Sequence, residues 1–179
     1  MRMKQCKSGL LCQKQRYSTK WGENRLMTQI LYKCTITNDP HPENAGQLNA
    51  LKMQYAEELA KITGREEEEF YCFKNPVNVT ATDQNGTIIG FIAVGMAEQE
   101  KRVYACHVYV MPQVRNQGVY RTMLARLVKF AEDIKYKSIT AGVFKNNKIS
   151  QKAHRALGFV PFANLYELKV GDADLHGLK

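Results

Sequence analysis

The 179-residue chain lacks long apolar runs, although 44% of its residues are hydrophobic, enough for one domain with a sizeable core. No stretch approaches the roughly 18 consecutive apolar residues that a membrane-spanning helix needs. The N-terminal segment is basic, but it has no apolar core of the about 7 to 15 residues found in secretory signals. We therefore expect a cytoplasmic protein that does not enter a membrane.

Cysteines are few, odd in number and widely separated. The five are Cys6, Cys12, Cys34, Cys72 and Cys106. They form neither a CxxC pair nor a Cys/His spacing typical of zinc ligands. This pattern indicates a reduced protein, and we expect no bound metal.

Two common phosphate-binding motifs are also missing. The sequence contains no GxxxxGK[ST], which argues against a P-loop nucleoside triphosphatase, and no GxGxxG, which argues against a dinucleotide-binding fold. Any phosphate site in this chain must therefore have another form.

Charge is unevenly distributed along the chain. Residues 1–26 contain seven Lys or Arg and one Glu, which accounts for +6 of the net charge of +9. A tail that binds nucleic acid or a membrane surface is one interpretation. We favour an unstructured extension over residues 1–29, because neither interleaved aromatics nor an amphipathic period accompanies the charge. A nucleic-acid partner is therefore not expected.

Apolar periodicity and turn residues predict alternating strands and helices. The order is a strand over 30–37, a helix over 47–62, a hairpin over 77–96, a strand over 103–110, a helix ending near 135, a strand over 138–144, a helix over 149–157, and one or two strands over 159–170. The apolar face of the first helix comprises Leu48, Leu51, Tyr55, Leu59 and Ile62, and that of the second comprises Met123, Leu124, Leu127, Val128, Ala131 and Ile134. Because a helix separates strands 103–110 and 138–144, we expect them to be parallel. The prediction is one domain over 30–170 with a mixed sheet and helices on its faces, followed by a tail over 171–179.

The turn between strand 103–110 and the next helix carries the first functional signal. The stretch VYVMPQVRNQGVYRTML (108–124) places Arg115 and Gly118 directly before the helix. Free N–H groups at a helix N-terminus, a glycine that lets the backbone bend, and a nearby guanidinium together suit an anion. An ordinary turn with a surface arginine is the alternative.

Two motifs together give the turn a more specific interpretation. VMPQVRNQGVYRTML resembles motif A of the GNAT superfamily of N-acetyltransferases: Arg or Gln, two residues, Gly, one residue, then Gly or Ala. NNKISQKAHRALGF (146–159) resembles the second signature of that family, matched here by Asn147, Ser150, Leu157, Gly158 and Phe159. The resemblance covers about residues 30–170. It implies a mixed α/β GNAT fold, with a mostly antiparallel sheet and a central, splayed parallel strand pair flanked by helices.

The resemblance also implies acetyl-CoA as an acyl donor. Its pyrophosphate would lie on the turn and its pantetheine arm in the gap between the splayed strands, paired with free backbone groups. The implied cofactor-binding residues are Val108, Tyr109, Val110, Arg115, Asn116, Gln117, Gly118, Val119, Tyr120, Arg121, Asn147 and Ser150. Tyr120 departs from the usual Gly or Ala, while Gly118 is retained.

Direct acyl transfer to a primary amine needs a base for the amine proton and benefits from an acid for the departing thiolate. The family often has a tyrosine as this acid, five residues before the closing Phe, where this chain has His154. His107, which strand alternation places on one face with Tyr109 and opposite Tyr104, Cys106 and Val108, is a candidate base. Glu98, in the turn before the strand, is another.

Three functional hypotheses follow. The first is an N-acetyltransferase that acts on a small-molecule or protein amine. The second is a GNAT-fold sensor or interaction module that binds acyl-CoA without turnover. The third is a protein directed to nucleic acid by its basic N-terminus. The sequence identifies no acceptor and leaves monomer and homodimer open.

Overall fold

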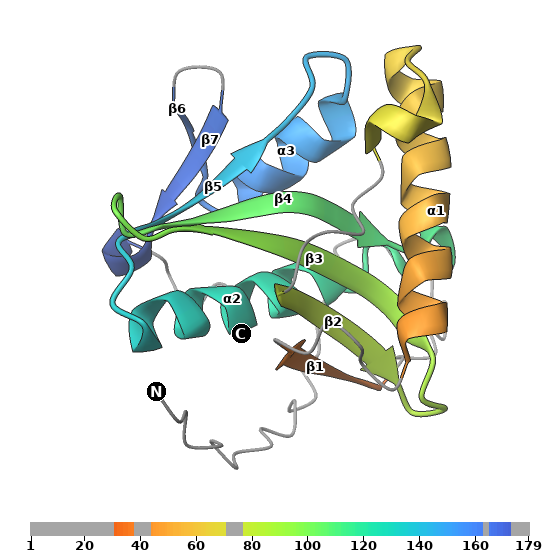
Figure 1. Ribbon diagram of the computed structural model, residues 1–179, viewed down its shortest axis with the longest axis horizontal. Coiled ribbons are helices and arrows are strands. Elements are labelled where there is room, and N and C mark those ends of the chain that lie inside the picture. The colour runs from red at the N-terminus through yellow and green to blue at the C-terminus, as the bar shows by residue number, and fades with distance from the viewer. Residues whose placement is uncertain (1–30, 38–43, 71–76, 163–164, 173–179) are drawn as a thin grey trace, which may run out of the picture.

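The computed structural model describes residues 31–37, 44–70, 77–162 and 165–172 (Figure 1). The extension predicted over residues 1–29 lies outside these ranges, as do residues 173–179 of the predicted tail.

The observed elements follow the predicted order, and residues 159–170 supply two strands. The helices and strands are β1 (Tyr32–Thr37), α1 (Ala45–Thr63), β2 (Val77–Asp83), β3 (Ile88–Ala97), β4 (Arg102–Val110), α2 (Val119–Asp133), β5 (Ser138–Gly142), α3 (Lys148–Ala156), β6 (Val160–Phe162) and β7 (Leu165–Lys169). Short 3₁₀ turns η1 (Glu67–Phe70), η2 (Pro112–Val114) and η3 (Val170–Asp172) complete the set.

One sheet organises the molecule. Its strand order is β1-β2-β3-β4-β5-β7-β6, and its strand pairs are antiparallel except for β4 with β5. The strand–helix–strand connection through α2 makes this pair parallel, as the sequence predicts. The predicted mixed, mostly antiparallel sheet flanked by helices is therefore confirmed.

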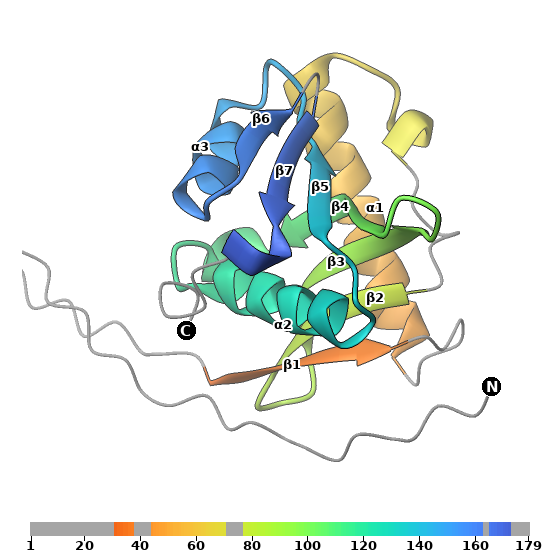
Figure 2. The same cartoon turned by 90° about the vertical axis from the view of Figure 1, so that its left-hand side faces the viewer.

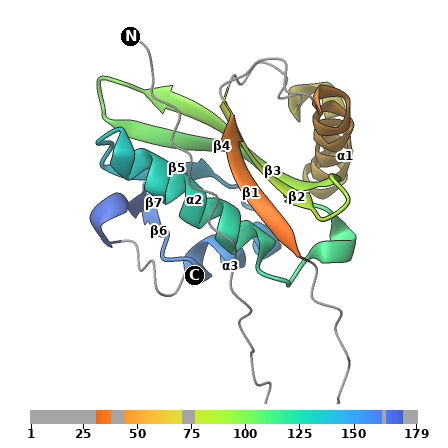
Figure 3. The same ribbon diagram turned by 90° about the horizontal axis from the view of Figure 1, so that it is seen from below.

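Helices α1 and α2 cover opposite faces of the sheet (Figure 3). The predicted apolar face of α2 packs into the larger core with Met123, Leu124, Leu127, Val128 and Ala131, all fully buried. On the opposite face, Leu48 and Leu51 of α1 pack against Phe91 and Tyr109. Helix α3 lies beside β6 and β7 (Figure 2), and His154 contacts the ring of Tyr166.

The parallel pair separates before β4 ends. Pairing runs from Arg102 with Ser138 to Ala105 with Ala141, whereas β4 continues to Val110. Strand β4 keeps its antiparallel partner β3 along this length, from Ala97 to Gly90. The second half of β4 is therefore held on one edge and leaves β5 on the other.

No helix in the described ranges has both the length and the apolar character needed to cross a membrane.

Gly90 provides a test of how closely β3, β4 and α2 pack. A Cβ at this position would lie 3.0 Å from the carbonyl oxygen of Tyr109 and 3.2 Å from Cε of Met123. We expect Gly90→Ala to lower the free energy of unfolding by about 1–3 kcal/mol, because the backbone of β4 cannot yield easily. Gly46→Ala in α1 is the control, since nothing lies within 4 Å of its added Cβ. Urea titration should show this variant unchanged or more stable by up to about 1 kcal/mol, and equal effects of the two changes would contradict the packing argument.

Candidate active site

A bulge in β4 sits where β4 leaves β5. In the pairing of β3 with β4, Ala93 is opposite His107 and Val94 is opposite Ala105, so Cys106 is an extra residue on β4. A β-bulge of this kind bends the strand and re-aims the side chains after it. Bending at this point is consistent with the separation of β4 from β5.

The bulge also changes which face each side chain of β4 occupies. Val103 and Ala105 pack into the α2-side core before it, and Val108 and Val110 pack there after it. Tyr104, on the alternate positions, therefore shares the α1 face with His107 and Tyr109. The Sγ of Cys106 lies on this face as well, 3.1 Å from where a Cβ on Gly95 would be. The prediction that Tyr104 and Cys106 lie with Val108, opposite His107, is wrong because the extra residue resets the alternation.

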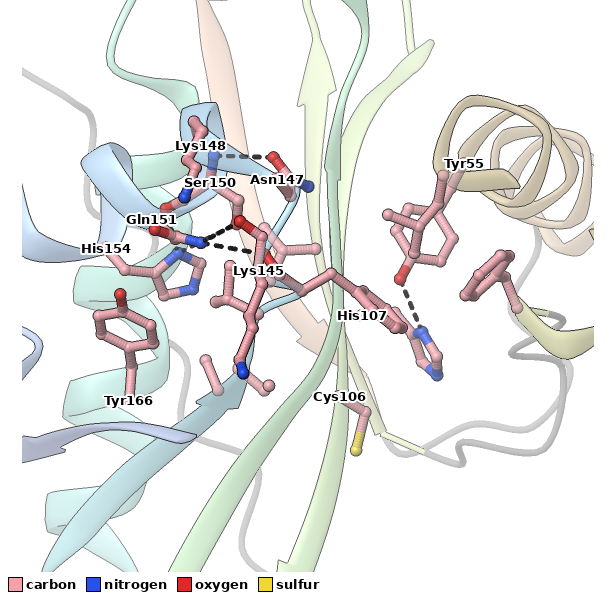
Figure 4. Close-up of a pocket in the computed structure, with 18 of the residues that line it drawn as sticks. Tyr55, Cys106, His107, Lys145, Asn147, Lys148, Ser150, Gln151, His154 and Tyr166 are labelled. Carbon is pink, nitrogen blue, oxygen red and sulfur yellow. Dashed lines mark hydrogen bonds between the residues drawn. The ribbon is translucent and has the colours of Figure 1, made fainter. Parts of the chain in front are cut away.

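A cleft of about 820 Å³ occupies the separation of the two strands. Its walls come from α1 and η1 on one side of β4 and from β5, α3 and β7 on the other (Figure 4). The β4 residues that line it are Ala105, Cys106, His107 and Val108. After the part of β5 that pairs with β4, the lining residues are Gly142, Val143, Phe144 and Lys145. The cleft thus runs through the sheet.

His107 lines the α1 side of the cleft and contacts Tyr55. Its Nδ1 lies 3.0 Å from the Tyr55 hydroxyl, and Figure 4 shows the two side chains facing each other. Burial, followed by the nearby Lys52 ammonium, lowers the pKa of His107 from its usual value of 6.5. The imidazole is therefore neutral at pH 7 and has a nitrogen lone pair that can accept a proton.

His154 lies on the opposite side of the cleft and is buried. Its Nδ1 is 2.8 Å from the backbone oxygen of Ser150, which only accepts, so Nδ1 carries the hydrogen. Nε2 then accepts from the Tyr120 hydroxyl at 3.0 Å. Burial lowers the pKa of His154 and raises that of Tyr120, so both side chains stay neutral. Both ring nitrogens of His154 are thus engaged by protein atoms.

The turn before α2 has the geometry of an anion site. Asn116 and Gly118 have φ of 62° and 80°, and Gly118 is the N-cap of α2 without a side-chain cap bond. The N–H of Thr122 donates to the oxygen of Gly118, so the helical bonding pattern of α2 begins there. The N–H groups of Val119, Tyr120 and Arg121 precede this bond, in the first turn of the helix.

Arg115 points from this turn toward α1. Its Nε donates to the backbone oxygen of Val110 at 2.9 Å, and its terminal nitrogen lies 2.6 Å from a carboxylate oxygen of Glu58. The guanidinium also lies over the ring of Tyr109, 5.5 Å from its centroid. The side chain therefore connects the turn to α1.

Asn147 caps α3 at the mouth of the cleft. Its Oδ1 accepts the N–H of Ser150 at 3.0 Å, which is a helix-capping bond. The side-chain amide of Gln151 donates to the backbone oxygens of Phe144 and Lys145, at 3.1 and 2.9 Å. These bonds give the β5–α3 loop a fixed shape beside the cleft (Figure 4).

Phe144 of this loop meets η1 across the cleft. Its ring packs edge-on against Phe70 at 5.6 Å, and the guanidinium of Arg65 lies 5.5 Å from its centroid. Arg65 is in turn paired with Glu69 at 2.8 Å. The two walls of the cleft are thus in contact at this end.

The structure gathers some of the predicted site residues and separates others. His107, Val108, Asn147, Ser150 and His154 all line the cleft. The turn residues Arg115 to Arg121 do not line it, but Tyr120 joins this turn to α3 through His154.

Glu98, Tyr109 and Val110 also lie away from the cleft. Glu98 is exposed in the β3–β4 turn, at the end of β4 that is still paired with β5. Tyr109 and Val110 are paired with Phe91 and Gly90 of β3, beyond the part of β4 that lines the cleft.

Several residues of the cleft were not predicted from the sequence. Tyr55 carried a usable signal, because it lies on the predicted core-facing side of α1 and a half-buried tyrosine needs a partner for its hydroxyl. Phe70, Phe144 and Tyr166 had no such signal, since their neighbours are distant in sequence. Among the described residues, no group of three or more His, Cys, Asp or Glu is placed to hold a metal ion.

Comparisons with known proteins agree with this architecture. The model of the acetyltransferase (GNAT) family matches residues 43–159. The L-amino acid N-acyltransferase MnaT of Escherichia coli (strain K12) is 29% identical over 90 residues, which are 49% of this chain and 52% of that protein. The chain thus spans about half the length of this curated relative.

Solved structures show the same fold. An acetyltransferase of the GNAT family from Staphylococcus aureus Mu50 aligns with a TM-score of 0.63 at 12% identity, covering 76% of this chain and 99% of that one. The PaiA N-acetyltransferase of Thermoplasma acidophilum in complex with coenzyme A aligns with a TM-score of 0.63 at 14% identity, with coverage of 76% and 99%. With the family model matching well over half of its length, the chain belongs to the GNAT acetyltransferase family.

Proposed function

We propose that this protein transfers the acetyl group of acetyl-CoA directly to a primary amine of a small molecule or protein. The observation that carries the proposal is the cleft formed where β4 leaves β5, next to a helix N-terminus suited to a pyrophosphate. Membership of the GNAT family and the N-acyltransferase relative support it.

The donor is assigned to the α2 and α3 side of the sheet. The pyrophosphate lies on the N–H groups of the turn from Gln117 to Arg121, where Gly118 permits the required bend. The pantetheine arm extends along the edge of β4 near Val108, which β5 no longer covers. Because the Oδ1 of Asn147 caps α3, the amide nitrogen of that side chain is the group that donates to the arm.

The acceptor amine approaches from the α1 side, where His107 acts as the base. With Nδ1–H donating to Tyr55, Nε2 takes the amine proton. The amine nitrogen bonds to the thioester carbonyl carbon, and the oxyanion that forms is stabilised by backbone N–H groups of β4. The C–S bond then breaks, and the departing thiolate takes up a proton that His107 returns through water.

Free amino acids are the first acceptor class to test. The curated relative is an L-amino acid N-acyltransferase by name. Lys145 and Lys148 at the rim of this cleft are exposed cations that suit a substrate carboxylate. A panel should compare L-amino acids with polyamines and with lysine-containing peptides.

Release of free CoA thiol tests the proposal. We expect acetyl-CoA and at least one amine of the panel to give thiol at a rate above that of acetyl-CoA alone, with an equal amount of N-acetyl product by mass spectrometry. Tight binding of acetyl-CoA without thiol release across the panel would instead support the sensor hypothesis.

A matched pair of glycine substitutions tests the phosphate turn. Gly118 and Gly86 have φ of 80° and 82°, so a valine is strained at either site, but Gly86 lies in the β2–β3 turn. We expect Gly118→Val to weaken acetyl-CoA binding at least tenfold by calorimetry, because the N–H groups lose their common direction. Gly86→Val should lower stability similarly and leave the affinity within about twofold. Equal affinities in the two variants would place the pyrophosphate elsewhere.

The pH profile of kcat tests His107. Because its pKa is lowered from 6.5, wild-type kcat should fall only at pH below 6.5, where the imidazole becomes protonated and cannot accept the amine proton. His107→Gln should lower kcat by about 10²–10⁴-fold and remove this low-pH limb. The pKa of His154 is lowered as well, so His154→Gln is the control and should keep the limb. If the fall in kcat at low pH persists in His107→Gln and disappears in His154→Gln, then His154, and not His107, is the base.

A further inference from the structure

Helix α1 contacts both functional parts of the molecule through two residues one turn apart. Tyr55 faces His107 in the cleft, and Glu58 faces Arg115 in the phosphate turn. Residues at positions i and i+3 project from the same side of a helix. A shift of α1 that disturbs one contact would therefore disturb the other.

The contact between Glu58 and Arg115 is specific and directional. The 2.6 Å ion pair is half-buried, with 37% of the Arg115 and 35% of the Glu58 side-chain surface exposed. The second guanidinium contact, from Nε to the oxygen of Val110, is made to the last residue of β4. The guanidinium thus joins α1, the end of β4 and the turn, and the Glu58 carboxylate raises the pKa of Arg115.

Tyr109 connects this ion pair with the pair at His107. Its ring lies under the Arg115 guanidinium and also packs edge-on against Tyr55, with centroids 6.2 Å apart. Tyr55 packs in the same manner against Phe91 and against the His107 ring, at 6.0 and 5.4 Å. The position of the Tyr55 hydroxyl therefore depends on how α1 is seated on β3 and β4.

We infer that the Glu58–Arg115 ion pair is a positioning device that seats α1 on β4 and so holds Tyr55 against His107. This inference rests on the proposed function, because it gives the pair a role in the chemical step. Arg115, although it belongs to the motif that resembles a phosphate site, then acts through α1, and the pyrophosphate is held by backbone N–H groups. The carboxylate of Glu58 binds the guanidinium of Arg115 and so turns this side chain toward α1.

A charge exchange separates this role from direct binding of the pyrophosphate by Arg115. Glu58→Arg and Arg115→Glu each place like charges together, and the double variant E58R/R115E restores an opposite pair. We expect each single change to lower kcat on the order of tenfold, because the base loses its alignment, and to leave KM for acetyl-CoA within about twofold. The double variant should recover most of the lost kcat.

Glu57→Arg is the matched control. Glu57 is the neighbouring acid on α1, and it is exposed and paired with Lys61 at 2.6 Å. The Glu57→Arg substitution makes the same change of charge on α1 as Glu58→Arg does, so we expect its kcat to stay within about twofold of wild type. Circular dichroism and thermal unfolding establish that each variant is folded. A rise in KM for acetyl-CoA of tenfold or more in Arg115→Glu and in the double variant, with Glu58→Arg equal to the control, would overturn the inference and make Arg115 a phosphate ligand.

An NMR titration of His107 gives a readout that does not need turnover. Lys52 and Tyr55 of α1 are the titratable side chains that act on this imidazole, and the strand pattern places Tyr104 and Tyr109 on the same face of β4. Misplacing Tyr55 exposes the ring to water, so its pKa should rise toward 6.5 in both single variants and fall back in the double variant. An unchanged His107 titration in the single variants overturns the inference. This titration pattern without thiol release in wild type overturns the proposed function alone.

Discussion

The separation of β4 from β5 is the constraint on which the rest of this structure depends. A strand in the middle of a sheet normally has both edges hydrogen-bonded, and unpaired buried backbone groups are costly. Here β4 is bonded to β3 over its whole length but to β5 only as far as Ala105. Beyond Ala105 this edge of β4 is not paired with β5, and an extended ligand with amides of its own can pair with it there. The cleft thus lies where a neighbouring strand would otherwise pair with the second half of β4.

The bulge at Cys106 turns this gap into a site with two different sides. By adding one residue to β4, it directs His107 and Tyr109 toward α1 while Val108 and Val110 pack into the core beneath α2. Without the extra residue, strict alternation would place Cys106 and Val108 on one face and His107 on the other. A single irregularity thus places the titratable side chain of His107 on the α1 side of β4 and the apolar side chains of Val108 and Val110 on the α2 side.

Local sequence signals predicted the elements, their order and the parallel pair, because periodicity, turn residues and connection length are all readable from neighbouring residues. The core-facing residues of α2 were predicted for the same reason. Three features were not readable. The bulge depends on register between β3 and β4, the burial of Lys52 depends on what covers α1, and the partner of Arg115 lies 57 positions away in Glu58. A motif of six residues specifies the bend of a turn, but it cannot show which distant carboxylate will meet its side chain.

Tyr120 and His154 both depart from the family pattern, and one hydrogen bond links the two departures. Tyr120 stands where motif A usually has Gly or Ala, and His154 stands where the family often has tyrosine, 34 positions later. A buried hydroxyl without a partner costs about 1–3 kcal/mol, so a tyrosine at the start of α2 requires an acceptor nearby. The neutral Nε2 of His154 is that acceptor, and the backbone oxygen of Ser150 fixes the ring so that Nε2 faces Tyr120. Burial shifts the two pKa values in opposite directions, and both shifts favour the same protonation pattern, with the hydroxyl as donor and the imidazole as acceptor. The two residues therefore account for each other as a bond between α2 and α3, whereas the proposed base, His107, lies on the other side of the cleft.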